Sequence, residues 1–279
     1  MAGPESSSTA TWRTTGGDLS DAEWELIADL LDPPTVSKMG RPKKHDRRSI
    51  ANAVFYVAAT GCQWRHLPDK YPPWSTVHSY HLAWSRDGTW ERVGDRLRKM
   101  VRLAEGRDQE PSAGIIDARS VRGAATVTTS HPRHELSTRG YDAGKRVSGR
   151  KLFGLVDTLG LLVGVRVVAA SVSDNAGGMM VFDLARPKTD RLGRIWVDAG
   201  FKTAFAAYVR SRRVAVDVVN KIHPRGFHVL PRRWVVERTW SWTMNNRRLQ
   251  VDYERDPTIT EGFVWAAHSR LLLRRLTQP

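Results

Sequence analysis

Apolar residues recur every three or four positions through the first hundred residues of the chain. This spacing places them on one face of an α-helix. Ser20, Asp21 and Glu23 have the spacing of a capping box, so the first helix is expected to begin there. Ser75 is expected to cap a later helix, and Gly61 follows another as a typical helix terminator. Further helices are expected over residues 49–60, 75–86 and 89–104.

From residue 113 the pattern changes to short apolar runs, which are typical of buried strands. The runs 113–116 and 194–197 are each followed by an aspartate, and the turn signal at 157–160 predicts a hairpin between strands over 151–158 and 161–169. The same reading predicts helices over 175–185, 201–212, 232–249 and 259–276, and a strand over 214–219. A hairpin combined with alternating strands and helices predicts an α/β fold, a mixed sheet flanked by helices.

These patterns divide the chain into three parts. Residues 1–17 are rich in Ser, Thr and Gly and are expected to form a disordered tail. Residues 18–107 are expected to form a small all-helical domain, and residues 108–279 an α/β domain. The polar stretch 105–112 is interpreted as the linker between them.

The net charge of the chain indicates the kind of partner that it binds. Lys and Arg number 44 against 29 Asp and Glu, so the formal net charge is +15 and polyanions, nucleic acid above all, are attracted. A GC-rich genome is the other explanation of the high arginine content. It accounts for the choice of Arg better than for the net excess of positive charge. No apolar run reaches the roughly 18 residues of a membrane span, so no membrane partner is expected. The single cysteine, Cys62, fits a reducing cytosol, and a cytoplasmic, nucleoid-associated protein is expected.

Three carboxylates are candidates for chemistry. Asp117 and Asp198 each follow a predicted buried strand, and Glu237 lies on the predicted helix 232–249. Acidic side chains at the ends of neighbouring strands repel one another, and a hard divalent cation removes that repulsion. Taken singly, an aspartate after a strand is more often a turn or cap residue, and Asp157 and Asp174 are interpreted in that way.

Several blocks of sequence, in a fixed order, resemble one protein family. The first holds Ile115-Ile116-Asp117-Ala118-Arg119-Ser120-Val121, and the later ones are Gly140–Lys145, Gly149–Lys151, Leu155–Gly160, Trp196–Phe201 and Gly226–Thr239, with Gly61–Arg65 and Pro72–Val77 in the N-terminal part. Together they resemble the bacterial insertion-sequence DDE transposases, specifically the group named after insertion sequence five. The resemblance extends over nearly the whole chain after residue 18.

The resemblance implies a ribonuclease-H-like fold with a metal-binding set of two aspartates and one glutamate, Asp117, Asp198 and Glu237. It implies two Mg²⁺ ions, for which Mn²⁺ substitutes, and DNA partners: the terminal inverted repeats of the element and the target DNA. A homodimer in the DNA complex is also implied. The chain departs from the family pattern at Leu230, where a Tyr is usual, and at Met244, where a Lys or Arg is usual.

Candidate DNA contacts come from four segments of the chain. They are a basic loop like a minor-groove arm (Arg41, Lys43, Lys44), a helix-turn-helix-like pair (Ser75, Thr76, His78, with Ser79 and His81), a phosphate grip (Lys145, Arg146, Arg150, Lys151, beside Arg139), and the helix that holds Glu237 (Arg233, Arg248). The plainer alternatives are solvated loops and a helical bundle. The tryptophans at 74, 84 and 90 are expected to be core residues.

The activity expected from this reading is DNA transposition. Cleavage by a metal-activated water would be followed by attack of the freed 3′ hydroxyl on target DNA. Two alternatives stay open: a metal-dependent nuclease of the same fold that joins no strands, and a non-catalytic DNA-binding repressor.

Overall fold

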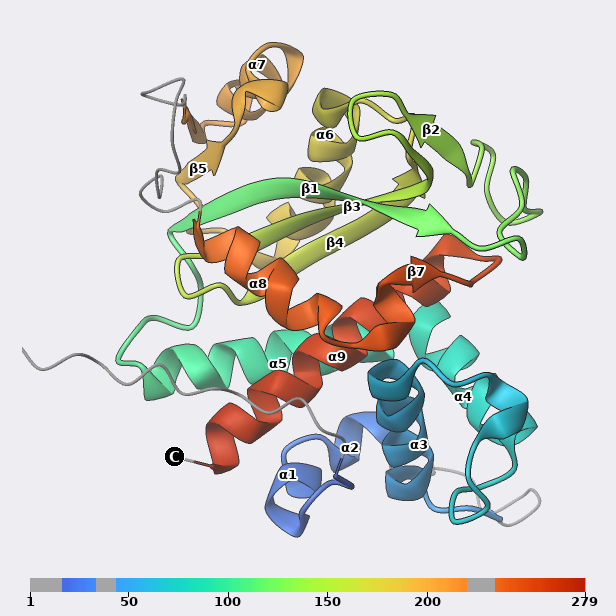
Figure 1. Cartoon of the computed structure of the whole chain (residues 1–279). Helices are drawn as coiled ribbons and strands as arrows, with labels where there is room; N and C mark the ends of the chain where they lie inside the picture. The colour runs from blue at the N-terminus through green and yellow to red at the C-terminus, as the bar shows by residue number, and fades with distance from the viewer. Residues whose placement is uncertain (1–16, 34–43, 220–233, 279) are drawn as a thin grey trace, which may run out of the picture.

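The computed structural model describes residues 17–33, 44–219 and 234–278 (Figure 1). Residues 1–16 of the predicted tail, the basic residues Arg41 and Lys43, and Arg233 lie outside the described residues. Within the described part of the chain, no helix is long and apolar enough to cross a membrane.

The N-terminal region is helical, as its periodicity predicts. Ser20 Oγ accepts the N–H of Glu23 at 3.2 Å and the Glu23 carboxylate accepts the N–H of Ser20 at 2.8 Å, which confirms the capping box. Gly61 follows α3 with φ 69°, in the left-handed region that ends helices. Ser75 is not a cap, because α4 begins at Trp74 after Pro73. The elements are α1 (Asp21–Glu25), α2 (Ala28–Leu31), α3 (Arg47–Thr60), η1 (Trp64–His66), α4 (Trp74–Arg86) and α5 (Thr89–Ala104).

A mixed seven-stranded sheet forms the centre of the molecule. The sheet runs in the order β2-β3-β1-β5-β6, while β4 also pairs with β3 and β7 with β1. β1 is antiparallel to β3 and parallel to β5, and the predicted hairpin is the β3–β4 pair. The strands are β1 (Ala113–Gly123), β2 (Gly140–Asp142), β3 (Val147–Asp157), β4 (Leu162–Ala169), β5 (Arg194–Val197), β6 (Ala215–Val218) and β7 (Val251–Asp252).

Helices cover both faces of this sheet. On one face, α6 (Asp174–Ala185) and α7 (Ala204–Ser211) enclose a cluster around Phe153 and Phe205. On the other face, α8 (Trp234–Met244) lies against β1 and β3, and α9 (Pro257–Thr277) packs against β4. Short 3₁₀ turns, η2 (Arg186–Lys188), η3 (Ala199–Phe201) and η4 (Arg247–Leu249), complete the fold.

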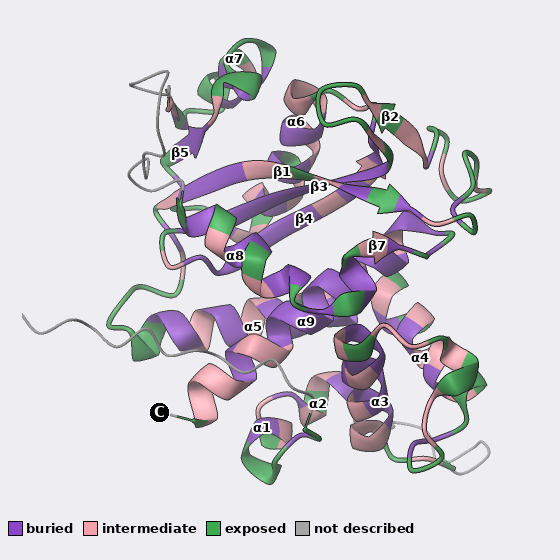
Figure 2. Cartoon of the chain, viewed as in Figure 1, coloured by how far each residue is buried: buried purple, intermediate pink, exposed green. Residues whose placement is uncertain are grey.

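The N-terminal helices and the second face of the sheet share one buried core (Figure 2). α9 connects them, because it packs against α3, α4 and α5 as well as β4. Gly94 on α5 leaves no room for a Cβ atom, since the indole ring of Trp265 on α9 lies directly over it. Trp84 and Trp90 are in this core, as expected, whereas Trp74 is 39% exposed and the expectation for it is wrong.

Two elements differ from their predictions in ways that bear on the site. β1 continues past Asp117 to Gly123, so Asp117 lies in the middle of a strand instead of at its end. The helix predicted over 232–249 ends at Met244, and Arg248 belongs to the separate turn η4. Trp240 and Met244 are buried, because they pack into the core beneath α8.

Candidate active site

Asp117 lies on β1, and Asp198 directly follows β5, the parallel strand that pairs with β1. The pairing of β1 with β5 sets Ile115 opposite Trp196, so Asp117 and Asp198, each two residues further along, are at the same level. Alternate residues of a strand share a face. Ile115 and Trp196 both belong to the core on the α8 side, and the two aspartates therefore lie toward α8.

Glu237 approaches the same place from α8. The ring of Trp240 covers Gly154, which has no side chain and pairs directly with Asp117 across β1 and β3. Glu237 precedes Trp240 by three residues, about one helical turn, and is exposed while Trp240 is buried. α8, which contains both residues, therefore crosses the strand pair that contains Asp117.

The three carboxylates have the chemistry of a hard-cation site, since Mg²⁺ prefers oxygen ligands. Asp117 and Asp198 are half-buried and Glu237 is exposed, so all three can reach solvent. Asp198 is also fixed locally, because its Oδ1 accepts the N–H of Gly200 at 2.8 Å. Their ligand atoms are not all within 4.8 Å of one another, so in this structure they form an open set.

Three of the basic residues predicted to contact DNA are buried and bonded to the protein. The Arg150 guanidinium is fully buried and donates to Asp252 at 3.0 Å and to backbone oxygens of Thr138 and Arg255, both at 2.8 Å. Because the guanidinium is enclosed by the fold and bonded within it, the prediction that Arg150 binds phosphate is wrong.

Lys151 and Arg248 need the same correction. Lys151 Nζ is 3.3 Å from Asp174 and 3.5 Å from Asp142, on the α6 side of the sheet. Arg248 is 8% exposed and forms an ion pair with Glu254 at 2.6 Å. Both side chains are engaged inside the fold, which their charge in the sequence did not reveal.

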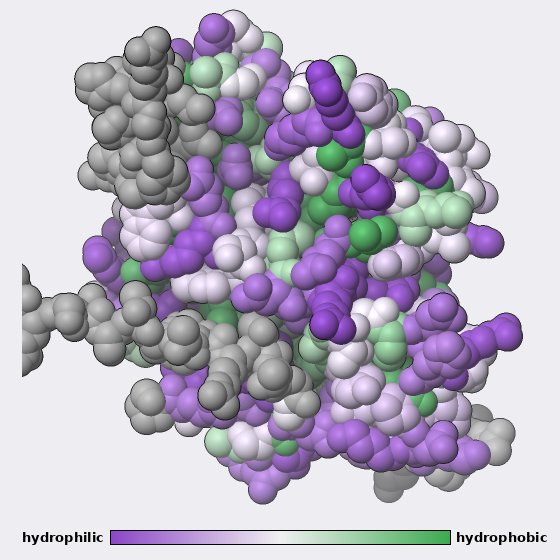
Figure 3. All heavy atoms as spheres, viewed as in Figure 1, coloured by the Kyte–Doolittle hydropathy of each residue, from purple (hydrophilic) through white to green (hydrophobic). Residues whose placement is uncertain are grey.

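Other predicted contacts lie on the surface. Lys44, Lys145 and Arg146 are exposed, as is Ser75, and Thr76 is half-buried. Figure 3 shows hydrophilic residues intermixed with hydrophobic ones on this face, in a colouring that does not distinguish positive from negative charge. For these exposed residues, a role in DNA binding stays a prediction.

The histidines of α4 turn inward. His81, expected to face bases, is fully buried, accepts the indole N–H of Trp90 at 3.1 Å, and burial lowers its pKa to about 3. His78 is half-buried with its ring edge-on to Trp64, 5.1 Å between centroids. Burial, followed by the charges of Arg248 and Arg86, lowers the pKa of His78, so it is neutral near pH 7. Neither ring is placed as a cationic DNA contact.

Arg119 is a candidate that the sequence reading missed. It follows Asp117 by two residues on β1, so both side chains are on the same face of the sheet, and Arg119 is exposed. The alternation of a longer strand would have identified it, but the apolar run that predicted the strand stopped at residue 116.

Comparison with known proteins identifies relatives for most of the chain. Residues 19–94 match the family model described as a putative transposase of the IS4/5 family, and residues 108–272 match the model described as a transposase DDE domain. No curated protein matches the chain. Among solved structures, the Mos1 mariner paired end complex with Mn is similar at 10% identity, over 91% of this chain and 84% of that chain, with a TM-score of 0.25. The mixed sheet with its flanking helices is a ribonuclease-H-like transposase core.

Proposed function

We propose, because the chain belongs to the family of transposases with a DDE domain, that it cuts DNA at the ends of an insertion sequence and joins the freed 3′ hydroxyl to target DNA. Asp117, Asp198 and Glu237 are the proposed catalytic carboxylates. The observation that carries this assignment is the register of β1 and β5, which sets the two aspartates level on the face that α8 covers.

The three carboxylates are the proposed ligands of two Mg²⁺ ions, which Mn²⁺ can replace. Enzymes of this family use divalent metal ions. Two such ions, when bound about 3.5–4 Å apart, stabilise the attacking and leaving oxygens of a phosphodiester. The Asp198–Gly200 hydrogen bond keeps one carboxylate oriented before any ligand arrives.

Positive side chains around these carboxylates would hold the DNA backbone. Arg119 lies on the same face as Asp117, and Lys145 and Arg146 extend from the turn between β2 and β3. Lys145 Nζ donates to the backbone oxygen of Ala118 at 2.9 Å, which places its ammonium group next to the strand residue after Asp117. Contacts of this kind provide affinity that is independent of sequence.

Selection of the element ends is assigned to the N-terminal helices. Ser75 and Thr76 at the start of α4 are the proposed base contacts, and Lys44, with Arg41 and Lys43 outside the described residues, is the proposed arm. Two copies of the chain would bring two ends together. Because this region shares its core with α9, point variants test it more cleanly than a deletion of residues 1–107.

The decisive variant is Asp198→Asn. The amide keeps an oxygen that can accept the Gly200 N–H but loses the charge that attracts a hard cation, so the fold should persist while the reaction fails. Loss of metal-ion stabilisation costs several kcal/mol, about a thousandfold or more in rate. The measurement is strand cleavage and strand joining on element-end DNA in Mg²⁺, with DNA binding measured separately in Ca²⁺.

Asp183→Asn is the matched control. Asp183 is on α6, on the opposite face of the sheet, where its carboxylate accepts the hydroxyl of Tyr208 at 2.6 Å, and the amide can keep that bond. Its cleavage rate should equal that of the wild type. Normal cleavage by the Asp198→Asn protein would refute the assignment of Asp198 as a catalytic metal ligand. Cleavage without strand joining by the wild type would indicate a nuclease.

A further inference from the structure

A tight turn between β1 and β2 brings two histidines together. The N–H of His134 donates to the backbone oxygen of His131 at 3.0 Å, which closes the turn. The two rings lie on the same side of it, with centroids 5.4 Å apart. Both side chains are half-buried, so they are held in place and are still reached by solvent.

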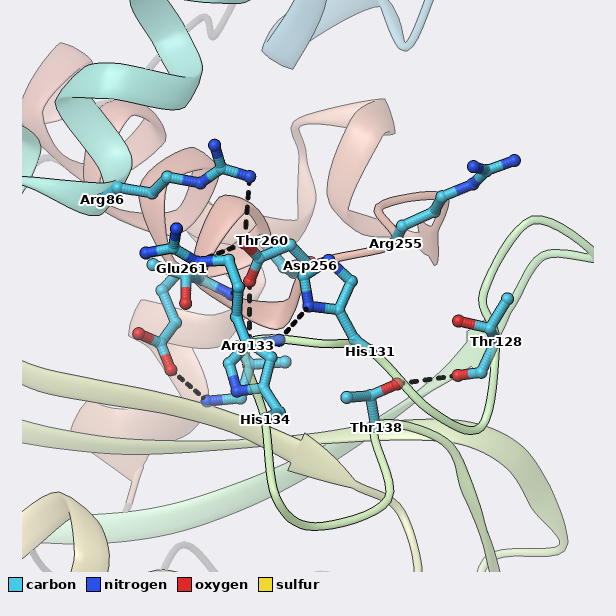
Figure 4. Close-up of polar contacts among 12 residues, drawn as sticks. Arg86, Thr128, His131, Arg133, His134, Thr138, Arg255, Asp256, Thr260 and Glu261 are labelled. Atoms are coloured by element: carbon cyan, nitrogen blue, oxygen red, sulfur yellow. Dashed lines mark hydrogen bonds and ion pairs between the residues drawn. The ribbon is translucent and has the colours of Figure 1, made fainter.

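The carboxylate of Asp256 faces these rings from the start of α9 (Figure 4). Asp256 is 3% exposed and caps the helix, since its Oδ1 accepts the N–H of Thr258 at 3.0 Å. The same oxygen is 2.9 Å from Nε2 of His134. Asp256 is therefore held in place with Oδ1 directed toward the ring of His134.

We propose that His131, His134 and Asp256 form a second metal site, which takes a transition-metal ion of the Zn²⁺ class. One ligand atom from each residue lies within 4.8 Å of the other two, and this is the only such trio among the residues that the structure describes. Tetrahedral Zn²⁺ at about 2.0–2.2 Å from its ligands sets those ligands roughly 3.3–3.6 Å apart. His134 Nε2 and Asp256 Oδ1 are 2.9 Å apart, so a small rotation of the half-buried His134 ring would have to open this contact to admit the ion.

The donor set selects the metal. Two imidazole nitrogens and one carboxylate oxygen suit Zn²⁺, whereas Mg²⁺ prefers oxygen ligands throughout. The site therefore differs in preference from the three carboxylates assigned to catalysis. It also stands independently of the proposed function, because none of its residues belongs to that set.

Two arginines define which oxygen of Asp256 a metal would use. Arg86 is 3.4 Å and Arg133 3.8 Å from Oδ2, so both guanidinium groups bind the oxygen that faces away from the His134 contact. Their positive charge weakens the attraction for any cation. Binding must then come from the nitrogen ligands, which favours a metal that bonds strongly to imidazole.

A metal here would act as a structural cross-link. The turn belongs to the segment that joins β1, which contains Asp117, to β2. Asp256 begins α9, the helix shared by the sheet and the N-terminal helices. Coordination would fasten this segment to α9 and raise the thermal stability of the whole chain, as any ligand specific for the folded state does.

The test is titration of the full chain with Zn²⁺, followed by calorimetry and by the shift in unfolding temperature. Asp198→Asn serves as the background, because it disables the carboxylate set without altering this turn. One Zn²⁺ should bind per chain and stabilise the fold. His131→Gln and His134→Gln should each weaken binding by about tenfold or more and abolish the thermal shift.

His66→Gln is the matched control, since His66 is an exposed histidine on another element, and it should bind Zn²⁺ as the background does. Circular dichroism checks that the His131→Gln and His134→Gln proteins are folded. Equal Zn²⁺ affinity in these two variants and the background would overturn the proposal. So would the absence of any Zn²⁺ binding to the background, which would leave an ordinary histidine–aspartate pair.

Discussion

Arg146 and Arg150 are four residues apart in one basic segment, but their side chains enter opposite environments. Arg146 is exposed in the turn between β2 and β3, at φ 55°. Arg150 is fully buried in β3 and bonded to Asp252 and to two backbone oxygens. One can meet a polyanion, and the other cross-links the fold. A basic residue in the sequence therefore becomes a candidate DNA contact only after the burial and the bonding partners of its side chain are known.

The same difference separates other charged residues of the chain. Arg248 pairs with the buried Glu254, whereas Lys145 extends along the surface beside β1. Such buried ion pairs, Arg150 with Asp252 among them, contribute nothing to the net charge of +15, because each joins one positive and one negative group.

The largest effect on stability is expected from removing a buried charge. Arg150→Met leaves the Asp252 carboxylate buried without its cationic partner, at a cost of about 3–5 kcal/mol in the free energy of unfolding. Urea unfolding measures it. Arg146→Asn, which tolerates a positive φ, is the exposed counterpart and should change stability by no more than about 0.5 kcal/mol. Similar losses in the two variants would erase the contrast between the two arginines.

The next largest effect on stability is expected from the carboxylate of Glu261. Burial raises the pKa of Glu261 to about 7, against the partial compensation of Arg166 and the N–H of Val167. Since the folded pKa exceeds the unfolded value of 4.5, the folded state holds a proton that the unfolded state releases. The stabilisation of the folded state by this bound proton is complete below about pH 4.5. It is lost as the pH rises to about 7, and the free energy of unfolding falls by at most about 3 kcal/mol over that interval.

Glu261→Gln isolates that contribution, because glutamine cannot titrate but can still accept the N–H of Val167. The free energy of unfolding of the wild type should fall more steeply with rising pH than that of the variant over this interval. Parallel pH profiles would show that Glu261 does not titrate there.

The smallest effect on stability, and a clear one on DNA binding, is expected at the exposed residues. The double variant Lys145→Gln with Arg146→Asn should remain as stable as the wild type within about 0.5 kcal/mol. Its DNA affinity should fall for all sequences, and the slope of log affinity against log salt should decrease by about 2, one for each lost phosphate contact. An unchanged slope would exclude these side chains from the DNA interface.

Local signals explain why much of the fold followed from the sequence. The periodicity of 89–104 gave α5 with its bounds, and the capping box at Ser20 gave the start of α1. Caps and amphipathic spacing depend on residues a few positions apart, so they can be recognised without the rest of the chain. β1 was predicted too short, because polar residues interrupt the apolar pattern beyond Asp117. These residues continue the strand because they pair with β3.

By itself, the sequence determined most of the helices and strands, the family, and the carboxylates proposed to act together. Only the tertiary structure decided which charged groups face solvent, that α9 joins the N-terminal helices to the sheet, and that His131 and His134 meet Asp256. Arg150 and Asp252 are 102 positions apart, and His134 and Asp256 are 122 apart. Burial and ion pairing arise between such distant segments, and no local pattern encodes which of them will meet.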